Sequence, residues 1–522
     1  MESFYNLPSE CLREIFSCLE NEYSTLYNCL FVSRTWCRQV VSILWRNPFR
    51  HKTFRPSPFF KQNNNSYSLC TTYLSALNEE EKKILHPYDS RHNLPPPLFQ
   101  YSSYLEKFSF ENIEAIAESW IKHEEAFEIP HDECCNRIKL IMAAILQLFL
   151  RTSCPKDVRV SYGYRSYDIL GGIPFSSYQP GFSRLINLAV GVTGFHPTPN
   201  LIELLKILPK LSTNLKGLEF VFDEDLYQEQ SVIDLLIDIM TAQSNLKKIS
   251  LEISSDFYSP TTKKFISALN CQKESLTSLS LYNVDFSSVS LNGIAECTLL
   301  ESMEIYYCRG AKNHSCAKFL QSPIQLKSLA FDGNDFKDVT LIPAFVEKAG
   351  KTLVCLSIDN LSDETIKTLM KCCPNLTDFT LLCNDQELDA FLDYLKGSNI
   401  SKLTVDSSEI CDSTELLEVL GDYIPRNLEK INLFSSFSPD SFERFLSDYY
   451  KSTSKSLRTL CIKDVTGDNY PKYLKAIESH AVFGTTLKTV LISSTVEITE
   501  EISILLRNIK RLRINASFVE DF

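Results

Sequence analysis

A short hydrophobic motif recurs along most of the chain. It consists of an apolar residue, two variable positions, a second apolar residue, one variable position and a third apolar residue, as in LKGLEF, LTSLSL and LEKINL. Alternation of apolar and variable positions is typical of a strand with one buried face, so each motif predicts a β-strand. The mean step over the twelve intervals is 27 residues, and the thirteen motifs begin at residues 185, 215, 246, 276, 300, 326, 353, 376, 400, 428, 457, 487 and 509.

The segments between these motifs carry apolar residues at helical spacing. Four clear examples lie at residues 231–240, 261–269, 363–372 and 441–450. A strand followed by a helix at a fixed period builds a solenoid, in which each repeat buries its apolar face against its neighbours. We therefore expect an α/β fold with parallel strands on the concave face and helices on the convex face.

The motif and its period resemble the leucine-rich repeat, whose units span about 20–29 residues and begin with L-x-x-L-x-L. The stretch LSDETIKTLMKCCPNLTDFTLLC, residues 361–383, is similar to the cysteine-containing class of these repeats. The second apolar position of each motif should be fully buried. Leu279, Leu329, Leu356 and Leu460 occupy this position.

A different pattern occupies the first 45 residues, which contain two of the three tryptophans. Pro8 and Ser9 stand where proline is tolerated at a helix start and serine can cap it. A segment this short buries too little surface to be stable alone, so it must pack on the rest of the chain or on another protein. Three amphipathic helices are indicated, with faces formed by Leu12, Ile15, Phe16 and Leu19, by Leu26, Cys29 and Leu30, and by Trp36, Val40 and Leu44.

This segment resembles the F-box through Leu7-Pro8-x-Glu10, Leu12, Ile15-Phe16, Leu19, Val32-Ser33-Arg34-x-Trp36, Val40 and Leu44-Trp45. The resemblance implies docking onto a Skp-type adaptor, and through it onto a cullin in an SCF-type ubiquitin ligase, while the repeats bind a protein substrate. The alternative is a non-catalytic leucine-rich-repeat scaffold whose N-terminal helices only cap the array. The residues expected to face the adaptor or support that face are Leu7, Pro8, Leu12, Ile15, Phe16, Val32, Trp36, Leu44 and Trp45.

Three domains are expected: a three-helix F-box at 1–50, a linker with irregular early repeats at 51–184, and the leucine-rich-repeat solenoid at 185–522. Within the middle region, Tyr73–Leu85 is expected to be one helix and Cys134–Leu150 a long convex helix. LEKFSF, from residue 105, and DVRVSY, from residue 157, fit strands. The glycine-flanked segment Gly171–Gly181 is expected to be an exposed loop.

Charge and cysteine content narrow the class of protein. The formal net charge of −12 and the pI of about 5.4 disfavour nucleic acid as a partner. The N-terminus lacks the features of a secretory signal, and the apolar run Ile138–Leu150 is shorter than the roughly 20 residues needed to span a membrane. The 18 cysteines form no C-x-x-C pair, which favours reduced thiols in the cytoplasm or nucleus.

The sequence offers no catalytic constellation. It contains no G-x-S-x-G, no G-x-x-x-x-G-K-[ST] and no H-E-x-x-H, and its 15 glycines form no phosphate-binding loop. No spacing sets one cysteine or aspartate apart as a nucleophile beside a base. We therefore expect a non-enzymatic receptor subunit without a cofactor or metal.

Candidate substrate residues come from the strand alternation, since side chains at alternate positions leave the core and line the concave face. A solvated sheet surface would account for most of these positions. Acidic residues recur among them beside aromatic rings, and this combination suits a substrate segment with Lys or Arg. The concave positions are Glu252, Ser280, Thr380, Thr404 and Asn432, together with the candidate substrate-binding residues Tyr282, Glu304, Tyr306, Asp332, Asp359, Asp406 and Phe434.

Overall fold

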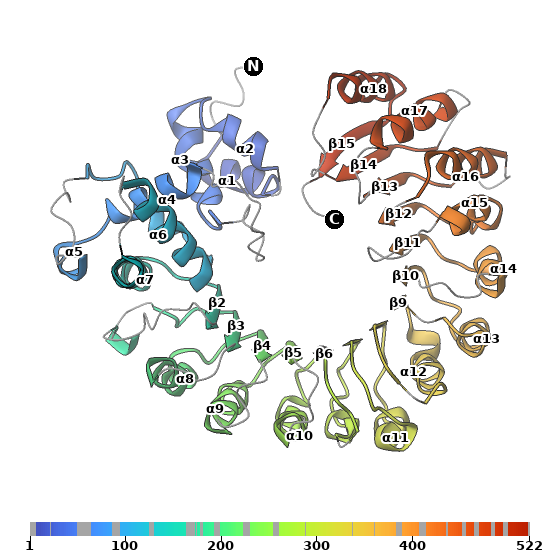
Figure 1. Ribbon diagram of the computed structural model, residues 1–522, viewed down its shortest axis with the longest axis horizontal. Coiled ribbons are helices and arrows are strands. Elements are labelled where there is room, and N and C mark those ends of the chain that lie inside the picture. The colour runs from blue at the N-terminus through green and yellow to red at the C-terminus, as the bar shows by residue number, and fades with distance from the viewer. Residues whose placement is uncertain are drawn as a thin grey trace. The chain divides into compact units, whose positions relative to one another are not determined.

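The protein folds into a solenoid of alternating strands and helices, seen in a computed structural model (Figure 1). Its residues divide into two compact units, Met1–Thr261 (unit one) and Thr262–Phe522 (unit two). The structure describes residues 7–20, 22–49, 64–85, 94–124, 130–162, 173, 175–177, 181–192, 199–222, 230–253, 260–287, 289–336, 338–359, 361–382, 389–406, 414–434, 437–451, 456–463, 469–481, 486–493 and 499–519.

Unit one begins with the three predicted helices, α1 Ser9–Ser17, α2 Tyr23–Cys29 and α3 Arg34–Leu44. The side chain of Ser33 caps α3, because its Oγ accepts a hydrogen bond from the Trp36 N–H at 3.2 Å. Ser9 does not cap α1 as predicted; it is the first helical residue, and Pro8 stands before it without a side-chain cap bond. The helices share a core of Leu12, Phe16, Leu26, Val40, Ile43 and Leu44.

The expectation of one helix over Tyr73–Leu85 is wrong. The structure has two helices there, α4 Asn64–Leu74 and α5 Glu79–Leu85. The separation arises at Asn78, whose Oδ1 accepts the Glu81 N–H at 2.8 Å while the Glu81 carboxylate accepts the Asn78 N–H at 2.9 Å. This reciprocal pair starts a new helix.

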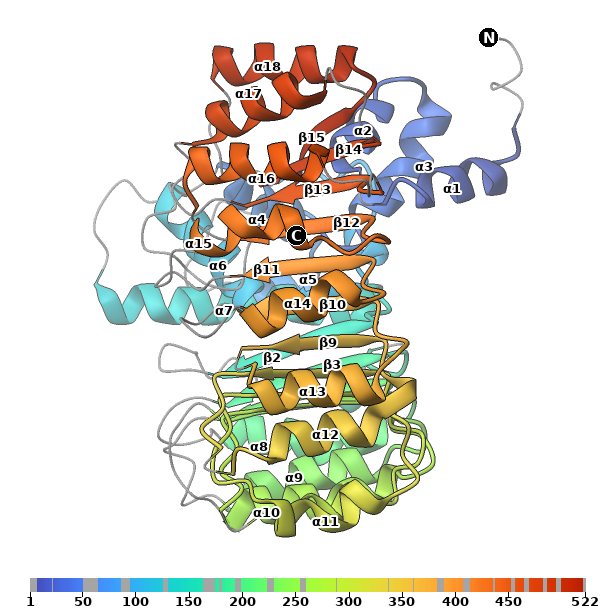
Figure 2. The same cartoon turned by 90° about the vertical axis from the view of Figure 1, so that its right-hand side faces the viewer.

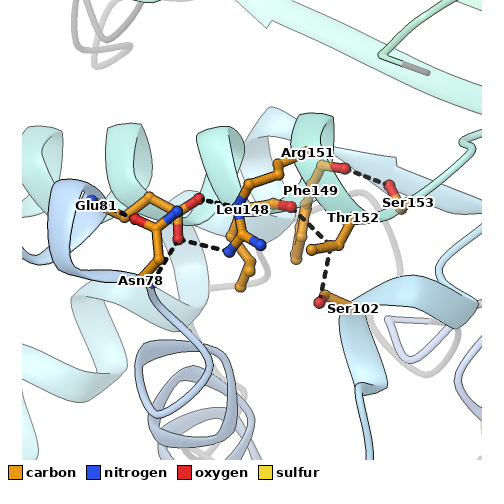
Figure 3. A network of polar contacts seen from close by, with 8 residues as sticks. All are labelled: Asn78, Glu81, Ser102, Leu148, Phe149, Arg151, Thr152 and Ser153. Carbon is orange, nitrogen blue, oxygen red and sulfur yellow. Dashed lines mark hydrogen bonds and ion pairs between the residues drawn. The ribbon is translucent and has the colours of Figure 1, made fainter. Parts of the chain in front are cut away.

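Two longer helices complete this part of unit one, α6 Phe110–Glu124 and α7 His131–Thr152. Helix α7 confirms the long helix predicted over Cys134–Leu150. Arg151, near its end, binds Glu81 on α5 through Nε and Nη2 at 2.7 and 2.9 Å (Figure 3). No described helix is long and apolar enough to cross a membrane.

The first strands are β1 Lys107–Ser109, β2 Asp157–Tyr162, β3 Asn187–Val192, β4 Gly217–Phe222 and β5 Lys248–Ile253. They are parallel and follow chain order, so the two strands that precede residue 185 continue directly into the regular repeats. Helices α8 Pro199–Leu211 and α9 Gln230–Thr241 connect successive strands, and α10 Pro260–Ala268 lies at the boundary of the two units.

Unit two repeats the same plan. In Figure 1 its helices lie along the outer side of the strands, and Figure 2 shows α12 to α18 in chain order. Its strands are β6 Ser278–Tyr282, β7 Ser302–Tyr306, β8 Ser328–Asp332, β9 Cys355–Ile358, β10 Asp378–Leu382, β11 Lys402–Asp406, β12 Lys430–Phe434, β13 Thr459–Ile462, β14 Thr489–Ser493 and β15 Asn515–Val519. Its helices are α11 Asn313–Gln321, α12 Leu341–Ala349, α13 Asp363–Cys372, α14 Asp389–Gly397, α15 Thr414–Tyr423, α16 Pro439–Lys451, α17 Tyr470–Ala481 and α18 Glu500–Arg511.

The repeat motif forms the core as predicted, except at the last motif. There residues 509–511 still belong to α18, Leu512 is 37 % exposed, and β15 begins only at Asn515, so the strand predicted from residue 509 is wrong. Leu279, Leu329, Leu356 and Leu460 are at most 2 % exposed. Neighbouring repeats are also joined just before each strand, where one backbone carbonyl accepts two N–H groups from the next repeat. The Thr277 carbonyl accepts from Glu301 and Ser302 at 2.9 and 3.0 Å, and the same arrangement recurs from Glu301 onward. We call this series of two-donor carbonyls the carbonyl ladder.

The segment expected to be an exposed loop, Gly171–Gly181, is only partly so. Some of its residues lie outside the described ranges, but Ile173 and Phe175 are buried at 7 % and 5 % exposure. The Phe175 ring stacks on Phe182 with a centroid distance of 6.0 Å. The apolar side chains outweigh the turn signals of the flanking glycines, so the expectation is wrong for these two residues.

Candidate functional site

The candidate substrate residues of unit two form a continuous row on the concave face. Strand register places Tyr282 beside Tyr306 and Tyr306 beside Asp332. The row resumes at Leu382, which pairs with Asp406, and Asp406 pairs with Phe434. Asp359 fills the position between the two halves, because it directly follows Ile358, the partner of Phe331 and Leu381. All these candidates are half-buried.

The two tyrosines form the aromatic end of this row. The rings of Tyr282 and Tyr306 lie with their centroids 4.8 Å apart. Glu304 belongs to the adjacent row, two residues before Tyr306, and accepts a hydrogen bond from Ser280 Oγ at 2.7 Å. Burial raises the pKa of the Tyr306 hydroxyl, and the neighbouring Glu304 carboxylate raises it further. The hydroxyl therefore stays protonated and can donate a hydrogen bond.

Two of the aspartates sit in surroundings that disfavour their charge. Burial raises the pKa of Asp332, against hydrogen bonds from Tyr307 and from the Gly333 N–H. Burial also raises the pKa of Asp406, where Lys463 acts in the opposite direction and the charge of Asp332 adds to the rise. Burial is thus the main cause of the raised pKa in both carboxyl groups.

Asp359 has a different role from the one its position suggested. Its Oδ2 accepts the Gly333 N–H at 2.6 Å, at a residue with φ of +61°. A Cβ on Gly333 would lie 2.3 Å from the Tyr307 ring, so the turn requires glycine. Asp359 thus supports the turn after β8, and its carboxylate is already engaged by the backbone.

Two concave positions differ from expectation. Thr404 and Asn432 are each only 6 % exposed, although strand alternation placed them on the open face. Asn432 Nδ2 donates to Thr404 Oγ1 at 2.8 Å across β11 and β12. Among the described residues, Asn432 Oδ1 is buried and has no hydrogen-bond partner. Sequence reasoning missed this feature, since it depends on how neighbouring strands crowd the two side chains.

The residues predicted to face the adaptor, or to support that face, fall into two groups in the structure. Leu12, Phe16 and Leu44 are buried in the core of the helices themselves. Trp36 is half-buried against that core, edge-on to Phe16 at 5.0 Å. These four residues therefore shape the segment rather than present its surface.

The second group is exposed. Ile15 and Val32 are 44 % and 52 % exposed, Pro8 is exposed and Leu7 is half-buried. Sequence reasoning missed two further residues, Tyr27 at 54 % and Phe31 at 73 % exposure, whose rings contact each other at 5.4 Å. Phe31 precedes Val32 between α2 and α3, so two consecutive large apolar residues outside a helical face were the available signal. Large exposed apolar groups of this kind mark interaction surfaces.

The family comparison decides the nature of these helices, because residues 4–51 match the F-box-like family model. The chain therefore carries an F-box-like segment at residues 4–51, followed by the strand–helix repeats. No curated protein matches it.

Two solved structures are similar to parts of the chain. The leucine-rich repeat-containing protein LegL7 from Legionella pneumophila is 18 % identical, with 67 % of this chain and 98 % of that chain covered and a TM-score of 0.34. The mouse RP105/MD-1 complex is 13 % identical, with 69 % and 70 % covered and a TM-score of 0.29. At such scores the likenesses carry no argument about function.

The F-box-like helices are joined directly to the first repeat. The Trp45 ring lies 4.2 Å from Tyr101 and 5.8 Å from Tyr73, measured between centroids, so it packs on the chain that follows. The Arg46 carbonyl accepts the N–H groups of Glu106 and Lys107 at 2.8 and 3.0 Å. Arg46 thereby supplies the first step of the carbonyl ladder, in the place of a preceding repeat.

Among the described residues, no group of three or more His, Cys, Asp or Glu side chains could hold a metal ion. The buried thiols are also poor nucleophiles. Burial raises the pKa of Cys297 to about 11 and that of Cys308 to about 12. Thiols with such pKa values remain protonated at neutral pH.

Proposed function

We propose that the protein is the substrate-recognition subunit of an SCF-type cullin–RING ubiquitin ligase. In this role the F-box-like helices bind a Skp-type adaptor and the repeats bind a protein substrate. The observation that supports this most directly is the pair of exposed aromatic rings, Tyr27 and Phe31, beside Val32 in a segment that matches the F-box-like model.

The exposed surface matters because the core of the helices is already complete. Leu12, Phe16 and Leu44 pack against other residues of the same segment, and Trp45 packs against Tyr101 and Tyr73. An N-terminal cap would need only these internal contacts. Phe31, at 73 % exposure, contributes little to such a cap and is suited to anchor a partner.

The alternative, a scaffold whose helices only cap the array, is supported by the Arg46 carbonyl at the start of the ladder. The two roles differ in a simple measurement. Binding of purified Skp-type adaptor to the full chain should be detectable by isothermal titration calorimetry if the proposal holds. A scaffold should show no binding.

Variants locate the binding surface. Phe31→Ser/Val32→Ser should weaken adaptor binding by about 30-fold, since loss of interface anchors commonly costs about 2 kcal/mol or more. The matched control is Val339→Ser/Met370→Ser, which removes apolar residues of 75 % and 68 % exposure from unit two. Equal affinities for the two double variants would contradict the assignment of the docking surface.

A further inference from the structure

We propose that the concave face of unit two binds a segment of the substrate through its Lys or Arg side chains, which the carboxylates of Asp332 and Asp406 receive. The inference rests on the proposed function in taking the occupant to be a protein substrate. It adds the chemical class of the segment and the residues that bind it.

The row of side chains provides the geometry. Asp332 has Tyr306 as its strand neighbour, and Asp406 lies between Leu382 and Phe434. Each carboxylate thus has an aromatic ring next to it in the same row. Lys and Arg bind well at such places, because the charged group meets the carboxylate while the stem, or a guanidinium plane, lies against the ring.

A second observation on the same face indicates a missing donor. Asn432 lies two residues before Phe434, and its hydrogen-bond partner Thr404 lies two residues before Asp406. The buried Oδ1 of Asn432 has no partner among the described residues, and a buried acceptor left without one costs about 1–3 kcal/mol. This oxygen is covered in the free chain, so an N–H group of a bound Lys or Arg would satisfy it once the Asn432 side chain turns toward the Asp406 carboxylate.

Three lysines lie on or beside this face, namely Lys402, its strand partner Lys430, and Lys463, and among the described residues none of them acts on Asp332. Lys402 is already paired with Asp378, with 2.7 Å between Nζ and Oδ2. Lys463 faces Asp406, while Asp332 has the Tyr307 hydroxyl and a backbone N–H rather than a cation. Burial is the main cause of the raised pKa of Asp332 and Asp406, so a cation brought by a bound segment would favour the charged form of both. A nucleic acid would bring phosphates to these carboxylates, so a basic protein segment fits better.

Fluorescence anisotropy with a defined probe tests the inference. The probe is a fluorescein-labelled 12-residue peptide with alternating Lys and Arg separated by Ser or Gly, and its reference has Gln in place of every Lys and Arg. The full chain should bind the basic peptide at least about tenfold more tightly than the reference, with a gap that narrows between 50 and 300 mM NaCl. Equal binding of the two peptides would overturn the inference.

Matched variants separate the site from the overall negative charge. Asp332→Asn/Asp406→Asn should weaken binding of the basic peptide by about tenfold or more, since it removes two charge contacts. Glu347→Gln/Glu364→Gln changes the net charge equally at exposed helical positions of unit two and should alter affinity less than about twofold. The same loss in both variants would mean that the peptide binds by net charge alone, and the assignment would fail.

A third variant does not depend on charge. Asn432→Leu/Thr404→Val removes the unpaired acceptor together with the buried hydroxyl that Asn432 binds, and should weaken the basic peptide several-fold without lowering thermal stability, because both partners are replaced by apolar groups. Unchanged affinity would remove Asn432 from the site. The adaptor titration gives a separate readout, since the concave variants should bind the adaptor normally. Failure of the peptide assay with intact adaptor binding would overturn only this inference.

Discussion

The ion pair between Arg151 and Glu81 offers a quantitative test of how unit one is held together. The Glu81 side chain is 3 % exposed and accepts two hydrogen bonds from Arg151, at 2.7 and 2.9 Å, and one from the Asn78 N–H (Figure 3). Arg151→Met would leave this carboxylate buried with only the backbone donor. Breaking a buried pair in this way costs about 3–5 kcal/mol.

The expected magnitude is smaller than the full range, because the Arg151 side chain is itself 38 % exposed and partly screened by solvent. We expect a loss of about 2–3 kcal/mol, which corresponds to a roughly 30- to 150-fold larger equilibrium constant for opening of the affected helices. Because damage in repeat proteins spreads mainly to neighbours, the readout should be local. Hydrogen–deuterium exchange should accelerate in α5 and the end of α7, and remain unchanged in β9 to β14.

Two comparisons make this prediction refutable. Glu81→Gln/Arg151→Met removes the buried charge as well as its partner, while Gln can still accept the Asn78 N–H, so it should be less damaging than Arg151→Met alone. Lys83→Met breaks only the exposed pair with Glu80 on the same helix and should leave exchange almost unchanged. If Arg151→Met behaves like Lys83→Met, or the double variant is the worst of the three, the reasoning is wrong.

Two further predictions concern unit two. Leu356→Ala, at a core position with 2 % exposure, should lower stability by about 2–5 kcal/mol and accelerate exchange in β8 to β10; a uniform acceleration through β13 and β14 would contradict nearest-neighbour packing. Binding of the basic peptide should weaken as the pH falls from 7 toward 4.5, because burial raises the pKa of Asp332 and Asp406 and they become neutral at a higher pH than ordinary aspartates. Their pKa values are lower in the unfolded chain, so the buried charges destabilise the fold at neutral pH and this penalty is relieved as the pH falls through the raised values. Asp332→Asn/Asp406→Asn should show a flatter pH profile of peptide affinity, and an equally steep profile would assign the titration to other groups.

The sequence predicts the repeats well because their signal is local and periodic. The spacing of apolar residues located β6 to β14 and the burial of Leu279 or Leu460, since each motif is specified by its own residues. The break between α4 and α5 was missed because the apolar spacing continues across it. There the reciprocal hydrogen bonds of Asn78 and Glu81 start a new helix.

The candidate sites were predictable in position and less so in chemistry. Strand alternation placed Asp359 in the row on the concave face. Only the structure shows that its carboxylate accepts the N–H group of Gly333 in the turn after β8. The unpaired oxygen of Asn432 arises from crowding between strands, which no local pattern records. Phe31 was missed because it lies on no helical face. It became a candidate only when the structure showed that its side chain is exposed.

The bond at the Arg46 carbonyl has a mechanical consequence. Two N–H groups of the first repeat donate hydrogen bonds to this one oxygen, and the Trp45 ring packs against Tyr101. The F-box-like helices are therefore fixed to β1 by backbone hydrogen bonds as well as by side-chain packing. A force exerted by a partner bound to the helices would therefore reach the first repeat through backbone hydrogen bonds. Residues inserted between Arg46 and Glu106 would lengthen the chain between these two points while both hydrogen bonds to the Arg46 carbonyl could still form.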